Sequence, residues 1–274
     1  LFDEFGYEIP TTWEDYQDLS DQLAEEHPGY ILGSVGDAFL GMMVYYWGAQ
    51  APVFQLDGDT FSSDFDAETS QRMTDLIDHM VDNGTLATDS VFGADFVQNY
   101  TGKVLGMPAP VWFTGAIFQN PESLNVPAGQ LGASAPLHWE GEEIGTGNVG
   151  GGTWLASSHS QNLDAAKTFM EFVTSADEYQ VELAPGYPAY QSAAEQWIAN
   201  QASGDYFVGD FEQTVVDAAG QVWSGWGYPS FSAETAYSKI VVPALAAGQT
   251  VASVVPDWQQ EMENEAQVQG YTID

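Results

Sequence analysis

The sequence predicts an α/β protein. Segments of strand-like composition alternate with segments whose apolar residues recur at helical spacing, and this alternation is typical of a sheet covered by helices. An Asp-Gly pair at residues 57–58 separates two short runs and predicts a β-hairpin. Apolar residues make up 44% of the 274-residue chain and aromatic residues 14%. This composition is sufficient for a buried core, so we expect a folded chain.

The first half of the chain contains predicted helices on both sides of the hairpin. Thr12 caps the first helix, which ends at His27-Pro28-Gly29. Its apolar face consists of Trp13, Tyr16, Leu19 and Leu23. A second, apolar helix is expected over residues 37–47, and the hairpin over 54–61. A further helix has its apolar face within residues 73–81 and is closed by Asn83-Gly84.

The second half begins with strand-like segments and then becomes mostly helical. Strands are expected at residues 103–109, 130–137 and 153–157, and a helix begins within 112–118. From Asn162 onward, helical spacing dominates.

The charge balance excludes polyanionic partners. The chain contains 40 acidic and 4 basic residues, which gives a net charge of −36. Such a surplus repels the phosphates of nucleic acids and anionic lipid headgroups. It is tolerated best where salt screens the repulsion or where low pH protonates carboxylates. No apolar run is long enough to span a bilayer, so no membrane insertion is expected in this segment.

Signatures of metal and cofactor sites are weak. The chain has no cysteine, and its histidines are scattered without metal-ligand spacing: His27, His79, His138 and His159. Residues 145–150 match G-x-G-x-x-G, but no apolar strand precedes them and a strand-like segment follows. We therefore expect no nucleotide, no metal and no other cofactor.

A carboxylate cluster is the nearest approach to a catalytic pattern. Glu140, Glu142 and Glu143 resemble the paired carboxylates of a glycosidase. In a chain with 40 acids, a chance cluster in a solvated loop is the simpler explanation. We therefore expect no catalytic residues and no enzyme activity.

A series of motifs follows a fixed order along the chain. They are 5–16 (FGYEIPTTWEDY), 107–112 (MPAPVW), 148–157 (NVGGGTWLAS), 162–175 (NLDAAKTFMEFVTS) and 185–189 (PGYPA), with C-terminal matches at 248–250 and 270–271. Their order and spacing resemble the family 1 extracellular solute-binding proteins, the group of the maltose-binding protein. Ala109-Pro110 and Gly152 depart from the family's pattern, which leaves the identity of the ligand open.

The resemblance implies a type II periplasmic binding protein-like fold, in which two α/β lobes close on a ligand by hinge motion. It also implies that the chain lacks the N-terminal part of such a protein and holds mainly the second lobe. Residues 1–157 would be the second-lobe α/β segment with cleft-lining strands. Residues 158–201 would be a helical return segment packed on the first lobe, and 202–274 the C-terminal helices returning to the second lobe.

The ligand contacts implied by the resemblance centre on Trp112, which matches an aromatic platform for sugar rings in the family. Asp37 lies near a position of hydroxyl-binding side chains, although a helix cap is the stronger interpretation. Asn148 is available to bond the ligand, with turn chemistry as the alternative. Gly151 and Gly152 would let the chain pass close to the cleft.

Further aromatic candidates come from the local sequence. Trp223, Trp226 and Phe231 lie in a loop rich in Gly, Tyr and Pro, where they either line the cleft or pack under the loop. Tyr45 and Trp47 end the apolar helix, where an aromatic stripe is more often core, so they are secondary candidates.

The expected function is that of the extracellular substrate-binding subunit of an ABC transporter, capturing a mono- or oligosaccharide for import. The partners would be the sugar and the membrane permease. The location would be the extracellular face of the cell membrane or the periplasm, with a lipid anchor upstream of this segment. The alternatives are a binding protein for a polyamine, peptide or other small solute, a carbohydrate-active enzyme, and a surface scaffold.

Overall fold

The computed structural model describes residues 1–274 as two compact units. Unit 1 comprises Leu1–Ala109, Ser134–Val149 and Ala218–Asp274, and unit 2 comprises Pro110–Ala133 and Gly150–Asp217. The chain therefore crosses between the units at residues 109–110, 133–134, 149–150 and 217–218. Helices and strands occur in both units, which confirms the predicted α/β class. The expected division into three consecutive segments stays a prediction.

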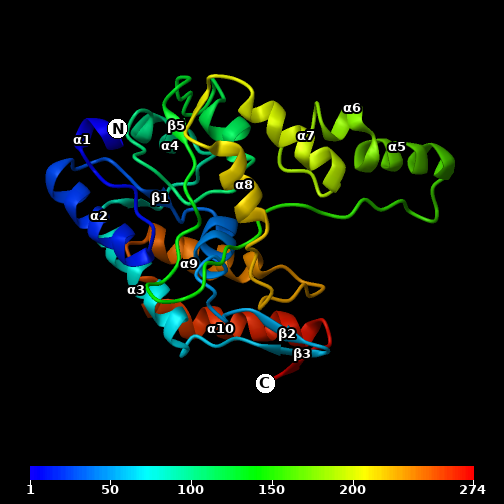
Figure 1. The fold of residues 1–274 in the computed structure, drawn as a ribbon. Coiled ribbons are helices and arrows are strands. Elements are labelled where there is room, and N and C mark those ends of the chain that lie inside the picture. Colours follow the sequence, from blue (N-terminus) through cyan, green and yellow to red (C-terminus); the bar gives the residue numbers. More distant parts are fainter. The chain divides into compact units, whose positions relative to one another are not determined.

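Unit 1 is mainly helical. Its helices are α1 (Phe2–Phe5), α2 (Trp13–Glu26), α3 (Glu68–Asp82), α4 (Ala94–Tyr100), α9 (Ala233–Ala246), α10 (Val251–Val268) and the π-helix η1 (Leu40–Tyr46). Figure 1 shows the long helix α10, which packs against α9 and α3. The helix expected over residues 37–47 is thus the shorter π-helix η1.

The ends of α2 and α3 have the caps that the sequence predicts. The Thr12 hydroxyl accepts a hydrogen bond from the Asp15 N–H at 3.0 Å, and the Asp15 carboxylate accepts from the Thr12 N–H at 3.2 Å. This reciprocal capping box satisfies N–H groups that the first helical turn leaves unpaired. At the end of α3, Gly84 has a φ of 78°, a conformation that favours glycine.

The strands of unit 1 are short. β1 (Gly33–Ser34) pairs in parallel with β4 (Leu86–Ala87). β2 (Gln55–Asp57) and β3 (Thr60–Ser62) form the predicted antiparallel hairpin, and β7 (Thr272–Ile273) adds to β3 in parallel. Gly58, with a φ of 59°, makes the turn of the hairpin.

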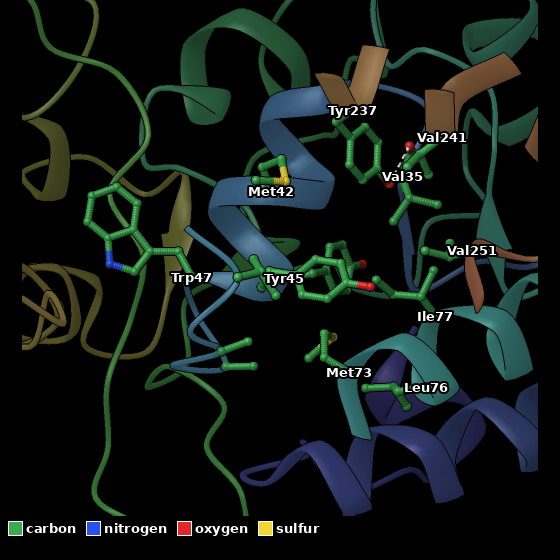
Figure 2. Packing of buried hydrophobic residues seen from close by; sticks show 14 of the residues in the cluster. Val35, Met42, Tyr45, Trp47, Met73, Leu76, Ile77, Tyr237, Val241 and Val251 are labelled. Carbon is green, nitrogen blue, oxygen red and sulfur yellow. Dashed lines mark hydrogen bonds between the residues drawn. The ribbon is translucent and has the colours of Figure 1, made fainter. Parts of the chain in front are cut away.

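The core of unit 1 surrounds η1 and α3 (Figure 2). Side chains from η1, α3, α9 and neighbouring segments pack together there, among them Val35, Met42, Tyr45, Met73, Leu76, Ile77, Tyr237, Val241 and Val251. The Tyr237 hydroxyl donates to the Val35 carbonyl at 3.4 Å, so this buried polar group has a partner. Tyr45 and Trp47 both belong to this core, and their rings point in opposite directions from the end of η1 (Figure 2).

Unit 2 is smaller. Its elements are η2 (Thr114–Phe118), α5 (Leu163–Ser175), α6 (Asp177–Gln180), α7 (Gln191–Ala202) and the parallel pair β5 (Leu131–Gly132) and β6 (Phe207–Val208). Helix α8 (Phe211–Ala219) begins in unit 2 and ends just beyond the crossing at residues 217–218. A small core joins Trp197, Ile198 and Phe211.

The three expected strands of the second half form only in part. Residues 130–137 contain the two-residue strand β5, and residues 103–109 contain a single bridge between Val104 and Ile31. Residues 153–157 form no strand. Trp154 and Leu155 in this segment are exposed and no strand pairs with them, so their β-propensity alone does not create a strand. No helix combines the length and the apolar character needed to cross a membrane.

Candidate functional site

Two indole rings connect the end of η1 to the loop before α9. Trp47 and Trp226 stack with ring centroids 5.2 Å apart and an angle of 12° between the planes. The Trp47 Nε1–H donates to the Trp223 carbonyl at 2.7 Å, and the Trp226 Nε1–H donates to the Ala51 carbonyl at 2.7 Å. Both rings are only 4% exposed. Trp47 and Trp226 therefore fix the loop and have little surface left for a ligand.

The loop of residues 222–231, here called the aromatic loop, is packed too closely to accept side chains at its glycines. A Cβ on Gly225 would lie 2.0 Å from the ring of Trp223, and one on Gly227 would lie 2.2 Å from the Cβ of Leu56. Phe231 is half-buried and contacts Phe54 edge to face at 5.4 Å. Trp223 is also half-buried, so Trp223 and Phe231 keep part of their surface accessible.

Tyr228 is an exposed ring on this loop that sequence reasoning missed. Its side chain is 74% exposed, and the ring lies edge-on to Trp47 with centroids 5.8 Å apart. A lone tyrosine in a loop has no periodic signal. The available signal was its position between Trp226 and Phe231, in the same stretch as the predicted candidates.

Asp37 joins two loops that follow parallel strands. Its carboxylate accepts hydrogen bonds from the Ser90 hydroxyl at 2.7 Å and from the Val91 N–H at 2.8 Å. The side chain therefore does not cap η1, and the helix-cap interpretation is wrong. At the start of η1 it is the backbone carbonyl of Asp37 that accepts a hydrogen bond, from the Leu40 N–H at 3.0 Å. Asp37 holds the carboxyl ends of β1 and β4 together, which is where α/β proteins bind ligands.

Phe39 and Phe92 lie at the same strand ends and were also missed. Their ring centroids are 6.1 Å apart, and Phe92 is 58% exposed. Tyr45, by contrast, is only 1% exposed, and its hydroxyl lies 3.3 Å from that of Tyr16. Burial raises the pKa of Tyr45 well above its ordinary value. Tyr45 is thus a core residue, in agreement with the alternative interpretation.

The segment before Asn148 passes very close to η1. A Cβ on Gly147 would lie 1.8 Å from the Met43 carbonyl oxygen, so only glycine fits at this crossing. Asn148 itself is exposed, at the last positions of unit 1 before the crossing at residues 149–150. Its side chain is therefore accessible, as a ligand contact requires.

One member of the acidic cluster, Glu142, belongs to an ion-pair network around Arg72. The guanidinium pairs with the carboxylates of Glu14 and Glu142 and lies 4.0 Å from the ring centroid of Trp139. The Glu14 carboxylate also accepts from the Glu140 N–H at 3.1 Å. These contacts tie residues 134–149 to α2 and α3. Glu142 thus serves a structural role in the network.

Trp112, the central candidate of unit 2, is half-buried and surrounded by glycines. Its ring lies edge to face with Phe113, at 4.6 Å between centroids. A Cβ on Gly186 would lie 3.0 Å from the Cβ of Trp112, and one on Gly150 would lie 3.5 Å from its Nε1. Gly151 and Gly152 have open space around their Cα atoms. Gly150 and Gly186 thus lie close to Trp112, and the role of Trp112 in ligand binding stays a prediction.

Comparison with known proteins places the chain in a family. Residues 2–195 match the family model described as bacterial extracellular solute-binding protein. The chain belongs to this family. The match confirms the resemblance seen in the sequence motifs and places this solute-binding protein in a family of binding proteins. No curated protein sequence matches the chain.

Solved structures agree with this assignment. An ABC transporter associated binding protein from B. animalis subsp. lactis Bl-04, in complex with β-1,6-galactobiose, matches with a TM-score of 0.79 and 19% identity, over 100% of this chain and 70% of the other. The galacto-N-biose-/lacto-N-biose I-binding protein of the ABC transporter from Bifidobacterium longum, in complex with lacto-N-biose, matches with a TM-score of 0.70 and 18% identity, over 100% and 67%. This solute-binding protein therefore has the periplasmic binding protein-like fold that the sequence predicts.

Proposed function

We propose that this chain is part of the extracellular subunit of an ABC importer that captures a carbohydrate. The family match carries the proposal, because it covers residues 2–195 and describes solute-binding proteins. The two similar structures support a sugar as the solute, since both hold disaccharide ligands. The partner would be the membrane permease, and the location the extracellular face or the periplasm, with a lipid anchor on the complete protein.

The ligand contacts that we propose are half-buried or exposed side chains on closely packed backbone. In unit 2, Trp112 offers ring surface for the apolar face of a pyranose. In unit 1, Trp223 and Phe231 offer ring surface of the same kind, and Asn148 offers an amide for sugar hydroxyls. Gly151 and Gly152 let a ligand approach the backbone. Trp47, Trp226 and Asp37 take a supporting role, because their polar atoms already bond to neighbouring loops.

A catalytic role for the acidic cluster has little support. Glu142 pairs with Arg72, and the backbone carbonyl of Glu143 accepts from the Gln50 amide at 2.8 Å. A glycosidase needs two carboxylates facing one bond, with the acid's pKa raised. We therefore keep the binding function without an enzymatic step.

An exposed apolar surface on unit 2 supports the proposed helical return segment at residues 158–201. Trp154 is 52% and Phe169 53% exposed, with ring centroids 5.6 Å apart, and Leu183 is 65% exposed. An exposed pair of large rings such as Trp154 and Phe169 is typical of an interface. We propose that the first lobe of the complete protein covers it. Amide hydrogen exchange in α5 of the complete protein should then be slow, and rapid exchange throughout α5 would contradict the interface.

Titration calorimetry of the complete protein against mono- and oligosaccharides tests the function, with spermidine as a cationic competitor. We expect heat from at least one sugar, a loss of about tenfold or more in affinity for Trp112→Ala, and a smaller loss for Trp112→Phe, which keeps a ring. Silence across the sugar panel overturns the sugar assignment, and binding of spermidine alone would favour the polyamine alternative. Reducing ends released from an oligosaccharide, and lost in the variant Glu140→Gln with Glu143→Gln, would favour an enzyme.

A further inference from the structure

We propose that Tyr228 is a ligand-contacting ring that makes this protein selective for an uncharged saccharide. The inference rests on the proposed sugar-binding function and names a residue and a ligand charge that the function alone does not specify. Three observations carry it: the exposure of the ring, the contacts that hold the loop beneath it, and the absence of charged residues from that stretch of the sequence.

The exposure of Tyr228 is unusual for an aromatic ring on closely packed backbone. The side chain is 74% exposed, whereas Trp226, two residues earlier, is 4% exposed. The Tyr228 ring meets Trp47 in an edge-to-face arrangement, with an angle of 66° between the planes. Most of the ring is therefore available for contact, and an aromatic face matches the apolar face of a sugar ring.

The aromatic loop is held from several sides. The Trp47 and Trp226 indoles each bond to backbone across the stack, and the Gln55 amide donates to the Gly225 carbonyl at 3.5 Å. Beyond Tyr228, the Ser230 N–H donates to the Tyr271 hydroxyl at 3.1 Å. A ring on a fixed backbone loses less conformational entropy when a ligand binds, which favours affinity.

The stretch of chain that carries Tyr228 contains no formal charge. Residues 218–233 contain no Asp, Glu, Lys or Arg, although the whole chain has 40 acidic residues. The side chains that hold the loop, those of Trp47, Gln55 and Tyr271, are uncharged as well. A site for a polyamine would combine aromatic rings with nearby carboxylates. A loop of rings and hydroxyls that carries no carboxylate of its own suits a neutral saccharide instead.

The other proposed contacts also lie in stretches of sequence without charged residues. Trp112 lies in residues 104–121, and Asn148, Gly151 and Gly152 lie in residues 144–163, and neither stretch contains Asp, Glu, Lys or Arg. In a chain with a net charge of −36, acidic residues are thus missing from each segment that carries a proposed contact. Excluding carboxylates avoids unpaired buried charges when the ligand displaces water.

A thiol-protection experiment tests the contact, because the chain contains no cysteine. The variant Tyr228→Cys of the complete protein is alkylated with and without β-1,6-galactobiose or lacto-N-biose, at about 100 times the Kd, where about 99% of the protein is liganded. Ile9→Cys, at a position that is 57% exposed in unit 1, is the control. We expect the sugar to slow alkylation at least about tenfold in Tyr228→Cys only. Equal rates with and without bound sugar overturn the contact.

Calorimetry separates this inference from the proposed function. For the neutral sugar that binds best, we expect Tyr228→Ala to lose about tenfold in affinity and Tyr228→Phe to stay within about twofold, because the ring makes the contact. Thermal midpoints of both variants should match the unmodified protein. Unchanged affinity of Tyr228→Ala overturns the role of Tyr228 but leaves sugar binding intact. Preference for a charged analogue, such as a glucuronate-containing disaccharide, overturns the charge selectivity. No binding of any sugar by the unmodified protein overturns both proposals.

Discussion

Trp47 and Trp226 are joined by a ring stack and by reciprocal hydrogen bonds. Their rings stack at 5.2 Å, and each indole N–H donates to a carbonyl in the segment of the other, Trp47 to Trp223 and Trp226 to Ala51. The pairing joins residues that are far apart in sequence through one buried contact. The position of the aromatic loop, and with it that of Tyr228, therefore depends on this contact and on the Gln55 and Tyr271 hydrogen bonds rather than on regular secondary structure.

This paired contact predicts that substitutions of Trp47 and Trp226 have non-additive effects on the free energy of unfolding. Trp226→Phe removes the N–H and leaves the buried Ala51 carbonyl without its donor, which should lower the free energy of unfolding by about 1–3 kcal/mol. Trp47→Phe should cost a similar amount. Because both rings act in one contact, the double variant should cost less than the sum. Urea unfolding followed by circular dichroism measures the two single variants and the double variant. Strictly additive losses would contradict the paired contact.

The hydrogen bonds of Asp78 to the start of α10 predict a second effect on stability. Its carboxylate accepts hydrogen bonds from the Val251 N–H at 2.6 Å and the Ala252 N–H at 2.9 Å, and partial burial raises its pKa. Asp78→Ala leaves both N–H groups without this acceptor and should cost about 1–2 kcal/mol. Asp78→Asn keeps an oxygen acceptor and buries no charge, so it should cost less. Thermal unfolding ranks the two variants, and an equal loss for both would argue against the capping role.

Arg72 predicts a salt-dependent effect. Its guanidinium pairs with Glu14 and Glu142 and stacks on Trp139 at 4.0 Å, with 30% of its side chain exposed. Arg72→Gln should lower the free energy of unfolding by about 1–2 kcal/mol in dilute buffer, and by less in 1 M salt because screening weakens the pairs. Lys239→Gln is the control, since Lys239 is 60% exposed and pairs with Glu261 alone. An equal, small effect of both variants would contradict a special role for Arg72.

The sequence predicted those parts of the fold that local chemistry determines. The helix cap at Thr12, the Asp-Gly hairpin and the buried face of α2 are each encoded within a few residues. The prediction of a strand at residues 153–157 is wrong, because strand formation depends on a partner strand that no local pattern reveals.

The candidate site shows the same limit. Trp112 and the glycine segment came from motif order, and the structure brings Gly150 and Gly186 against Trp112. The sequence could not tell that Trp226 is buried while Tyr228 is exposed, because the difference arises from the stack on Trp47, which lies about 180 residues earlier in the chain. Nor could it show that the carboxylate of Asp37 bonds to Ser90.

Asp15 predicts how acid weakens the start of α2. Hydrogen bonds from Thr11 and Thr12 lower the pKa of this carboxyl below its ordinary value of 3.8, and Thr11 makes the larger contribution. A lowered pKa in the folded state means that the ionised carboxylate stabilises the fold above the unfolded pKa, and that this stabilisation is lost as the pH falls through the folded pKa. The gap in thermal midpoint between the unmodified protein and Asp15→Asn should therefore be largest near neutral pH and close on acidification below about pH 4. Asp18→Asn, in the same helix but outside the capping box, should show a small gap at every pH, and a gap for Asp15→Asn that persists unchanged at low pH would refute the assignment.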